Sequence, residues 1–367
     1  MIMTPLIESL ALSATATDPV DSKDETSSRT PAVPRARIQA RLHLPQAERQ
    51  IEIPAGQTVL SAALDAGIPF PHGCRSGRCG ACRSMLVEGE VSMGTHTSFA
   101  LSEEDRAAGL ILACRATPIG DLTVRWLDES NPGTVSATHE ATVVGLHQMT
   151  DEIRLIRLRL KDRRAFRFAA GQYLTLMPEG APARHYSMAS RPDEELVDLH
   201  VAAVPGGQTS NHLMSSLETG SRVSVRGPAG SAYLRDAHHG PVVAVAGGSG
   251  LAPIKSIVET ALVTGMATPI RFYFAARTEK NLYLVEHFAM LMKRFANFSF
   301  IPVMSGERGN ERRTGRIQDA VAADHGSLVG YKAYVAGSPS LVGAVTPMLV
   351  ARGAALRDIH ADVFFSE

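Results

Sequence analysis

The sequence has little cysteine, little tryptophan and no long apolar run. Among 367 residues there are four cysteines and one tryptophan. So few cysteines in a chain of this length argue against a disulfide scaffold and favour metal binding or catalysis. No run approaches the roughly 18 consecutive apolar residues of a membrane-spanning helix. The apolar stretch near the start has no basic residue ahead of it, so we expect no export signal, no membrane partner and a cytoplasmic location.

A net charge of either sign is also lacking, because 37 Lys and Arg residues balance 37 Asp and Glu residues. This balance gives no indication of a nucleic-acid partner. The composition, 44% hydrophobic and 20% charged, is that of a globular protein, and the length predicts two or three modules. Residues 1–35 are rich in Ser, Thr, Ala, Asp and Pro and have no apolar period. We predict a disordered N-terminal tail there.

The four cysteines form one motif. Cys74, Cys79 and Cys82 stand in a CxxxxCxxC run, and Cys114 follows after 31 intervening residues. This is the spacing of plant-type ferredoxins, in which four thiolates hold two irons bridged by two sulfides. A loop can supply three of these ligands only if its backbone bends closely around the cluster. Nearby glycines permit that bend and leave N–H groups free to approach the sulfurs; they are Gly73, Gly77 and Gly80.

Structural zinc, a disulfide pair and incidental buried thiols are the alternatives for these cysteines. Zinc sites usually pair their cysteines in two short CxxC units, which this spacing does not match. Strand-like segments at 37–44, 50–55 and 122–127 and a helix-like segment at 58–67 surround the motif. We therefore predict a β-grasp-like α+β ferredoxin domain over residues 36–130 that carries a [2Fe–2S] cluster. No cysteine is left over to replace a lost ligand.

Four arginines flank the cysteines: Arg75, Arg78, Arg83 and Arg115. A positive collar of this kind would favour the reduced, more negative cluster and could dock an acidic partner. An ordinary solvated loop explains the same residues equally well.

A second module follows a polar linker that contains Pro132 and Gly133. Alternating apolar segments at 141–148, 156–160, 172–177, 196–204 and 221–227 predict an antiparallel six-stranded β-barrel over residues 137–236. The segment RHYSMAS lies between two of these strands. Taken alone, its arginine, tyrosine and serine are weak signs of a site, since a strand end with a surface charge is more common.

This segment resembles the RxYS flavin motif of the ferredoxin–NADP reductase superfamily. The resemblance implies that Arg184 contacts the flavin phosphate, that Tyr186 packs against the isoalloxazine ring and that Ser187 approaches its N5 atom, with Met188 in the same flavin-binding segment. The sequence PGGQTSNHL resembles the pyrophosphate segment of the same superfamily, and GPAG at 227–230 closes the barrel as in relatives. The pyrophosphate residues that this implies are Gly206, Gly207, Thr209 and Ser210.

The sequence period changes over residues 240–367. The buried-strand run 241–247 leads through GGSG into a helix with one apolar face, formed by Ile254, Ile257, Val258, Ala261 and Leu262. Strand, glycine turn and helix form the phosphate-binding arrangement of doubly wound sheets. The candidate residues of this turn are Gly247, Gly248, Ser249, Gly250 and Pro253. Apolar runs at 270–276, 298–304, 332–337 and 359–365, separated by helical stretches, predict an α/β domain with a parallel sheet that binds NAD.

Three further segments resemble the same superfamily. GGSGLAPIKS resembles its GGxGxxP nicotinamide-cofactor motif. AGSPSLV resembles its CGxP motif, with Ala336 in place of the usual cysteine, and implies cofactor binding by Gly337, Ser338 and Pro339. HADVFFSE resembles its ExF ending, with Asp362 in place of glutamate and Phe364 as the aromatic residue near the flavin; core packing of a last strand is the alternative for Phe364.

The resemblance also concerns the choice between NADH and NADPH. Arg277 stands where relatives contact the adenosine ribose. We find no cluster of basic residues for a 2′-phosphate at that strand end, which favours NADH over NADPH.

The order ferredoxin, flavin, NAD resembles reductase components of aromatic-ring-hydroxylating dioxygenases, such as those for naphthalene, terephthalate and benzoate. The implied reaction is hydride transfer from NADH to FAD, then two one-electron steps through the cluster to a terminal oxygenase component or a separate ferredoxin. Ser187, Asp362 and Phe364 are the predicted catalytic residues. The alternatives are a nonenzymatic redox carrier or sensor, and the same architecture serving a di-iron monooxygenase or a sugar deoxygenation system.

Overall fold

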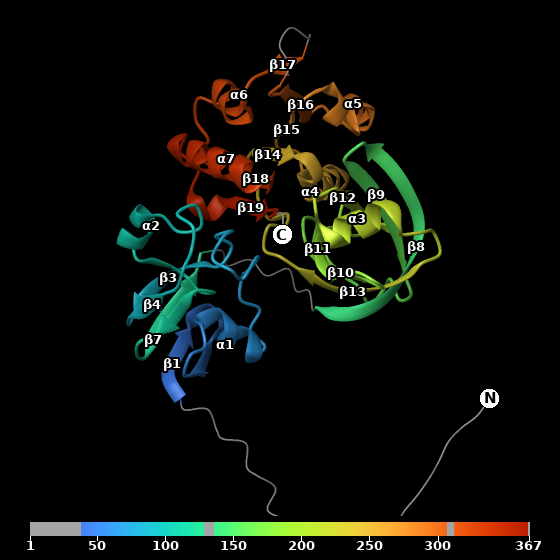
Figure 1. Ribbon diagram of the computed structural model, residues 1–367. Helices are drawn as coiled ribbons and strands as arrows, with labels where there is room; N and C mark the ends of the chain where they lie inside the picture. Colours follow the sequence, from blue (N-terminus) through green and yellow to red (C-terminus); the bar gives the residue numbers. More distant parts are fainter. Residues whose placement is uncertain (1–37, 128–135, 307–311, 366–367) are drawn as a thin grey trace, which may run out of the picture. The chain divides into compact units, whose positions relative to one another are not determined.

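The computed structural model describes residues 38–127, 136–306 and 312–365 (Figure 1). The predicted N-terminal tail and the linker residues Pro132 and Gly133 lie outside these ranges. Within them the chain forms two mixed or antiparallel sheets, one parallel sheet and a small two-stranded sheet. No helix in the described ranges is long and apolar enough to cross a membrane.

The first module is a five-stranded mixed sheet with a short helix against it. The strand order is β2-β1-β7-β3-β5, with β1 and β7 parallel and the other neighbours antiparallel. Helix α1 begins after Thr58, whose side chain accepts a hydrogen bond from the Ser61 amide at 3.2 Å. Its buried residues are Val59, Leu60, Ala62 and Ala63. This arrangement confirms the predicted β-grasp-like α+β fold.

The bounds of the elements in this module are as follows. The main sheet consists of β1 (Ile38–Leu44), β2 (Arg49–Pro54), β3 (Arg83–Glu88), β5 (Leu110–Leu112) and β7 (Leu122–Trp126). The small sheet pairs β4 (Val91–Met93) with β6 (Ala116–Pro118). The helices are α1 (Val59–Asp65), α2 (Glu103–Ala107) and the 3-10 turn η1 (Pro45–Ala47).

The second module is the predicted six-stranded antiparallel barrel. Its order is β11-β10-β13-β8-β9-β12, and a bridge between Met188 and Leu199 links the two edge strands and nearly closes it. Alternate side chains fill the interior, among them Val143, Leu174 and Val225, none of which is exposed. The elements are β8 (Ala137–Thr150), β9 (Ile153–Leu160), β10 (Tyr173–Pro178), β11 (Arg184–Ser187), β12 (Val197–Ala202), α3 (Gln208–Ser215) and β13 (Arg222–Ala229).

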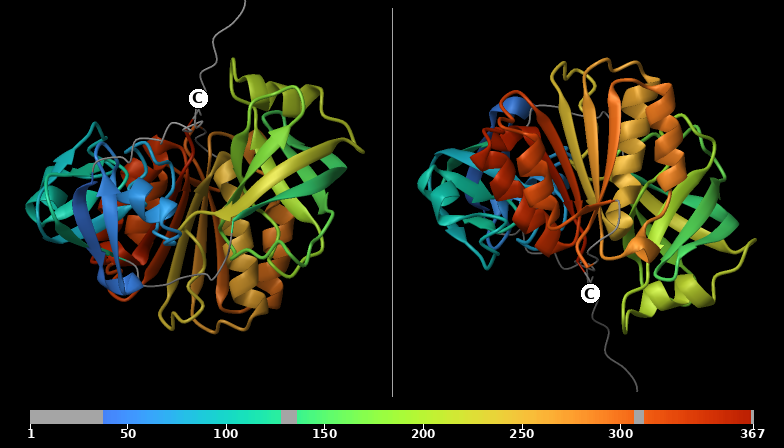
Figure 2. Two further views of the ribbon diagram at one scale, coloured as in Figure 1. Left: turned by 90° about the horizontal axis from the view of Figure 1, so that it is seen from below. Right: turned by 90° about the horizontal axis from the view of Figure 1, so that it is seen from above.

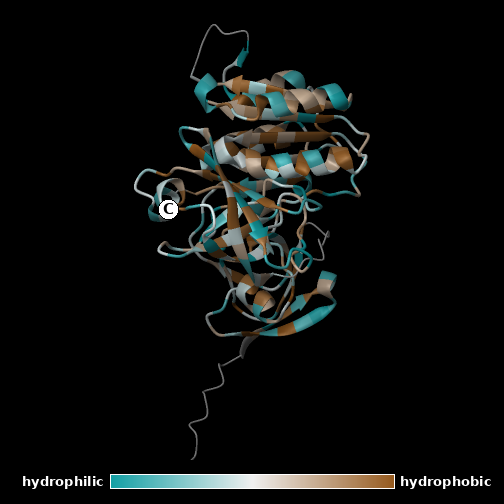
Figure 3. Cartoon of the chain, turned by 90° about the vertical axis from the view of Figure 1, so that its right-hand side faces the viewer, coloured by the Kyte–Doolittle hydropathy of each residue, from teal (hydrophilic) through white to brown (hydrophobic). Residues whose placement is uncertain are grey.

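The third module is a parallel sheet of order β17-β16-β15-β14-β18-β19 with helices on both faces, as Figure 2 shows. Alternation along β14 divides the core: Ala244 and Ala246 pack with residues of α4, whereas Val243 and Val245 pack with residues of α6 and α7. The strands of this sheet are among the most hydrophobic parts of the chain (Figure 3). This confirms the predicted α/β nucleotide-binding fold.

The elements of the third module are these. Its strands are β14 (Val242–Gly247), β15 (Ile270–Ala276), β16 (Phe298–Met304), β17 (Arg313–Thr314), β18 (Lys332–Gly337) and β19 (Ile359–Val363). Its helices are α4 (Leu251–Val263), α5 (Val285–Arg294), α6 (Ile317–Asp324) and α7 (Pro339–Ala351). Three 3-10 turns complete it: η2 (Gly248–Gly250), η3 (Glu279–Asn281) and η4 (Leu356–Asp358).

Helix α4 is buried on more than the apolar face that the sequence predicts. The five apolar residues of that face are all buried, but so are Ser256 and Glu259. The Ser256 hydroxyl donates a 2.7 Å hydrogen bond to the carbonyl of Ser190, and the Lys255 ammonium donates one of 3.2 Å to the carbonyl of Ala189. Both acceptors directly follow the RHYSM segment of the barrel. The helix that follows the glycine turn is therefore fixed to the predicted flavin motif.

Candidate functional site

One cavity of about 790 Å³ is lined by residues of all three modules. Most of the predicted site residues lie in its wall. From the cysteine loop these are Cys74 and Cys79; from the barrel, Arg184, Tyr186, Ser187, Gly207, Thr209 and Ser210; from the parallel sheet, Gly247, Gly248, Ser249, Arg277, Ser338, Pro339, Asp362 and Phe364. The fold thus brings together segments that are up to 290 residues apart, from Cys74 to Phe364.

The other predicted residues are not part of this wall: Cys82, Cys114, Met188, Gly206, Gly250, Pro253 and Gly337. Some of them hold the wall in place. Met188 is fully buried in the barrel core. A Cβ atom on Gly250 would lie 2.2 Å from the Ala336 carbonyl oxygen, so only glycine allows the turn to pack this closely on β18. Ala336 itself is buried and does not line the cavity.

The four thiols lie in two pairs. Cys74 is hydrogen-bonded to Cys79, and Cys82 to Cys114. The Cys79 contact is the largest influence on the pKa of Cys74 and lowers it to about 4. In the described residues no three His, Cys, Asp or Glu side chains form a site for a single metal ion. Two pairs fit a binuclear cluster, in which each iron takes two thiolates.

Backbone N–H groups also point at the sulfurs. The Cys74 amide donates to the Cys79 Sγ at 3.3 Å, and the amides of Ser76 and Arg78 donate to the Cys74 Sγ at 3.5 and 3.4 Å. Such donors stabilise thiolates and tune a cluster's potential. The bend that produces them needs Gly77 at φ 76°, where a Cβ would lie 2.9 Å from the Thr95 carbonyl oxygen. The loop therefore fits the cluster that its spacing predicts.

The arginine collar is only partly formed. Arg83 donates to the carbonyls of Ala100 and Phe99 at 2.6 and 2.5 Å and lies 3.6 Å from the Asp105 carboxylate, so it holds neighbouring loops together. Arg115 packs against Gly77 and Gly94. Arg75 is exposed.

The flavin segment offers positive charge and free amides. Arg184 donates one hydrogen bond to the adjacent Ala183 carbonyl at 3.0 Å and forms no ion pair with the described residues. The hydroxyl of Thr209 donates to the Pro182 carbonyl at 2.8 Å, so it is already engaged. The first amides of α3 have no acceptor within the helix. This guanidinium and helix terminus fit an anionic phosphate, with the amides rather than that hydroxyl as donors.

Ser187 and Asp362 form a hydrogen-bonded pair at the cavity wall. The serine hydroxyl donates to a carboxylate oxygen at 2.7 Å. Burial raises the pKa of Asp362 to about 6, and the bond from Ser187 opposes this shift. Burial likewise raises the pKa of the neighbouring Tyr186 to about 12, so that phenol stays protonated. The pair can hold or accept a proton near neutral pH.

Two residues at the site were not among those predicted from the sequence: His200 in the cavity wall and Tyr283 in contact with it. The Tyr283 hydroxyl donates to the Gly248 carbonyl at 3.1 Å and lies 3.1 Å from the His200 Nδ1. Because the Tyr283 hydroxyl uses its only proton for the bond to the Gly248 carbonyl, the His200 Nδ1 must carry a proton and donate it to the Tyr283 oxygen. The Nε2 atom of the neutral ring is then an acceptor. That Nε2 is buried without a partner among the described residues, and His200 lines the cavity. Burial lowers the pKa of His200 to about 3, so the ring is neutral.

The only sequence feature that concerns His200 is the alternation of side chains along β12. This alternation predicts a solvent-facing side chain, whereas His200 is buried. Val197, Leu199 and Val201 fill the barrel, so His200 belongs to the outer face, where solvent is the usual neighbour. Tyr283 of the third module covers that face instead, ring to ring at 5.4 Å. A sequence pattern cannot show which module covers an outer face.

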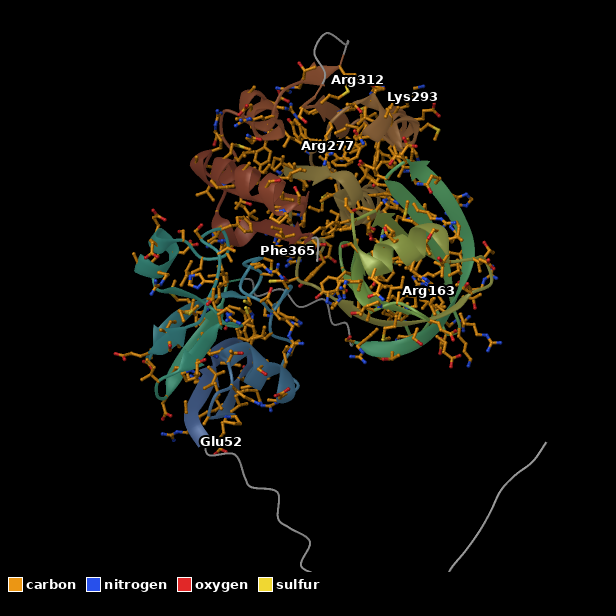
Figure 4. All side chains as sticks on the ribbon, in the orientation of Figure 1. Glu52, Arg163, Arg277, Lys293, Arg312 and Phe365 are labelled. Carbon is orange, nitrogen blue, oxygen red and sulfur yellow. The ribbon has the colours of Figure 1, made fainter. Side chains whose placement is uncertain are left out.

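Near Arg277 the described residues of the cavity wall carry little positive charge. Of the described residues after 240, Arg277 alone adds a cationic side chain to the wall. Arg312, labelled with Arg277 in Figure 4, pairs with Glu279 at 2.9 Å.

Comparison with protein families finds three matches in the order of the modules. Residues 42–118 match a 2Fe-2S iron-sulfur cluster binding domain, residues 140–233 an oxidoreductase FAD-binding domain and residues 244–346 an oxidoreductase NAD-binding domain. These matches cover the core of each predicted module; the exact boundaries at 36–130, 137–236 and 240–367 remain predictions.

Relatives match along most of the chain. The ferredoxin–NAD(P)(+) reductase component of the naphthalene 1,2-dioxygenase/salicylate 5-hydroxylase systems of Ralstonia sp. is 36% identical over 314 residues, 84% of this chain and 94% of the relative. The chain belongs to this family of oxygenase-system reductases. The reductase subunit of the Amycolatopsis aromatic O-demethylase is also 36% identical, over 86% of this chain and 96% of its own. The crystal structure of the Amycolatopsis cytochrome P450 reductase GcoB superposes with a TM-score of 0.70 at 33% identity, covering 88% of this chain and 98% of that one.

Membership in this reductase family fixes the general activity. The chain is an oxidoreductase with a [2Fe–2S] cluster, FAD and a nicotinamide cofactor, and it passes electrons to an oxygenase system. This favours the enzyme over a nonenzymatic carrier. An oxygenase or ferredoxin partner follows from the multi-component systems to which the relatives belong.

Proposed function

We propose that this reductase takes electrons from NADH and delivers them to the Rieske-type oxygenase, or the separate ferredoxin, of an aromatic-ring-hydroxylating dioxygenase. The observation that carries the proposal is the shared cavity, whose wall combines the cysteine loop, the flavin segment and the glycine turn. When bound, the flavin accepts electrons as a pair and releases them singly, which the change from nicotinamide to iron–sulfur chemistry requires.

The residues of the wall and their neighbours have separate roles in this proposal. Arg184, the turn residues Gly206 and Gly207, and Thr209 and Ser210 at the start of α3 hold the flavin phosphates. Tyr186 and Phe364 pack against the ring, and Met188 supports it from the barrel core. Ser187 and Asp362, 2.7 Å apart, hold the proton that accompanies flavin redox change.

The nicotinamide cofactor lies along the glycine turn in this proposal. Gly247, Gly248, Ser249 and Gly250, with Pro253 at the start of α4, approach its pyrophosphate, and Arg277 contacts the adenosine ribose. Gly337, Ser338 and Pro339 lie beside the nicotinamide. Because Arg312 is neutralised by Glu279, a 2′-phosphate would meet only Arg277 as a cation of this module in the described residues. NADH is therefore preferred to NADPH.

Anaerobic reduction of the purified holoprotein by each nucleotide tests the proposal. NADH should bleach the flavin absorbance and then produce the electron paramagnetic resonance signal of a reduced [2Fe–2S] cluster, at a rate at least about tenfold above that with NADPH, as expected for one missing charged contact. Flavin bleaching without a cluster signal, or equal rates with both nucleotides, would contradict the proposal.

A monooxygenase partner is the second candidate, favoured by specific relatives. The phenol hydroxylase P5 protein of Acinetobacter pittii and the reductase component of propane 2-monooxygenase of Gordonia sp. are 31% and 30% identical to this chain, each over 86% of it. Titrating the reduced protein with a Rieske oxygenase, a Rieske ferredoxin and a di-iron hydroxylase separates the candidates. Turnover of the Rieske acceptors supports the first proposal, and turnover of the di-iron hydroxylase alone replaces it with the second.

A further inference from the structure

The cysteine loop and the C-terminal segment meet in one specific contact. The guanidinium carbon of Arg78 lies 4.4 Å from the centroid of the Phe365 ring, within the range of a cation–π interaction. Arg78 stands between two predicted cluster ligands, and its amide donates to the Cys74 Sγ at 3.4 Å. Phe365, labelled in Figure 4, also packs against a group of buried apolar side chains that includes Cys79. Phe365, the last described residue of the chain, therefore contacts the loop that carries three of the four predicted iron–sulfur ligands.

The same short segment also contacts the flavin motif. Asp362, three residues before Phe365, accepts the hydrogen bond from Ser187. Between them the Phe364 amide donates to the Gly337 carbonyl at 2.8 Å and so continues the pairing of β19 with β18. A rigid strand end thus touches the flavin segment at Asp362 and the cysteine loop at Phe365.

We infer that Arg78 and Phe365 are positioning residues, which hold the cysteine loop at a fixed separation from the flavin segment and so set the rate of internal electron transfer. The inference rests on the proposed function. Electron transfer between two bound centres becomes slower as the distance between them grows, so its rate depends on where the cysteine loop is held. Both side chains line the shared cavity, but neither belongs to the glycine turn or to the flavin segment. The inference therefore concerns transfer from the flavin to the cluster, measured relative to the reaction with NADH.

The expected fall in the electron-transfer rate follows from the strength of the contact between Arg78 and Phe365. A cation–π contact stabilises by roughly 0.5 to 2 kcal/mol, depending on its exposure. If this energy maintains the transfer-competent arrangement, its loss reduces the population of that arrangement by about 2- to 30-fold.

Two electron acceptors distinguish the steps. We would measure NADH oxidation with ferricyanide, which takes electrons from the reduced flavin, and with cytochrome c, which takes them after they pass the cluster. A Cys114→Ser variant of the full chain calibrates the assay, since only the cluster-dependent acceptor should lose activity. The test variants are Phe365→Leu, Arg78→Met and the double variant, all as holoproteins with iron and flavin contents measured.

We expect each single variant to lower the ratio of the cytochrome c rate to the ferricyanide rate by about 2- to 30-fold. The double variant should lower this ratio no further than the more strongly affected single variant. Amide hydrogen exchange of residues 72–82 should become faster in each, a readout independent of turnover. Arg294→Met is the matched control, because Arg294 lies 5.1 Å from the Phe295 ring in a similar contact and neither residue lines the cavity.

The outcomes separate the inference from the proposed function. An unchanged ratio of the two rates and unchanged loop exchange in both single variants would overturn the inference while the wild-type rates still support the function. Additive losses in the double variant would also overturn it, because the two side chains would then act independently. If the wild-type holoprotein reduced neither acceptor with NADH, the proposed function itself would fail.

Discussion

The hydroxyl of Ser187 donates a 2.7 Å hydrogen bond to the carboxylate of Asp362, although 175 residues separate them in the chain. Ser187 ends the edge strand β11 of the barrel, and Asp362 lies in the edge strand β19 of the parallel sheet. One bond therefore joins the flavin-binding module to the C-terminal strand that completes the nucleotide-binding module. The aspartate at this position is long enough to reach the serine hydroxyl.

The Asp362 carboxyl should make stability depend on pH. Its pKa of about 6 in the folded protein exceeds its ordinary value of 3.8. As pH rises from about 4 to 6, the unfolded chain loses this proton first, so the free energy of unfolding falls and the loss is complete above pH 6. Asp362→Asn should therefore raise the unfolding free energy at pH 8 by about 1 to 2 kcal/mol, allowing for partial exposure, and by little at pH 4.

Thermal melts of wild type and Asp362→Asn at pH 4.5 and pH 8 check this expectation. Asp151→Asn is the matched control, because Asp151 is exposed in the turn between β8 and β9 and forms no ion pair with the described residues. A melting temperature that is lower in Asp362→Asn at pH 8 would mean that the carboxylate stabilises the fold, opposite to the expected sign.

Removal of any single thiol should abolish the cluster. The chain has no fifth cysteine, and each iron needs two thiolates. We expect Cys82→Ser and Cys74→Ser proteins to contain no stoichiometric iron and to lack the visible absorbance of the cluster, while they keep FAD and ferricyanide reduction. Metal analysis of the purified proteins measures this. Zinc in the wild-type protein, or an intact cluster in either variant, would show that these thiols are not the four ligands.

Tyr283→Phe should weaken binding of the nicotinamide cofactor. The change removes the bonds to the Gly248 carbonyl and to His200, each of 3.1 Å. A net loss of about 0.5 to 1.5 kcal/mol corresponds to a roughly 2- to 13-fold increase in the Kd for NAD and in the KM for NADH, with kcat less affected.

Isothermal titration with NAD measures the Kd, and steady-state kinetics show whether KM changes more than kcat. Tyr273→Phe is the control, because Tyr273 is a buried tyrosine of the same module whose hydroxyl donates to Asp324 at 2.8 Å, away from the cavity. Equal effects of the two substitutions on Kd would mean that the hydroxyl of Tyr283 does not position the glycine turn.

Ser256→Ala should loosen the junction of helix α4 and the flavin segment. Ser256 and Ser190 are fully buried, so loss of the 2.7 Å bond leaves a carbonyl without this donor. We expect a loss of about 1 to 3 kcal/mol in the free energy of unfolding and faster release of FAD on dilution. Thr264→Ala, which removes an exposed hydroxyl after the same helix, should change either quantity little. Equal melting temperatures of the two variants would contradict the expectation.

Local patterns were sufficient for most of the elements. Alternation in β10 and the buried run of β14 predict these strands because the partners of their side chains lie in the same module. The spacing of the four cysteines predicts the cluster because the chemistry of two irons fixes the number of ligands. Resemblance to known motifs supplied the flavin and nicotinamide residues, which composition and period alone left as weak candidates.

Contacts between segments that are distant in the chain could not be predicted in this way. The position of Arg83 next to Cys82 suggests that it belongs to a positive collar around the cysteines. In the structure its guanidinium instead donates to the carbonyls of Phe99 and Ala100. His200 reads as a surface residue of a strand, yet Tyr283 covers it. Each outcome depends on which segment packs against the residue, and that segment lies at least 16 positions away.

The sequence by itself determined the cluster type, the three modules and their order, because ligand number, apolar period and motif spacing are local properties of the chain. Only the tertiary structure decided that Ser187 meets Asp362 and that Phe365 meets Arg78. It also decided that a His200 nitrogen in the cavity wall has no hydrogen-bond partner among the residues that the structure describes. These relationships depend on the packing of one module against another. The free energy of that packing is the sum of many small contacts between distant segments, and no local pattern in the chain records it.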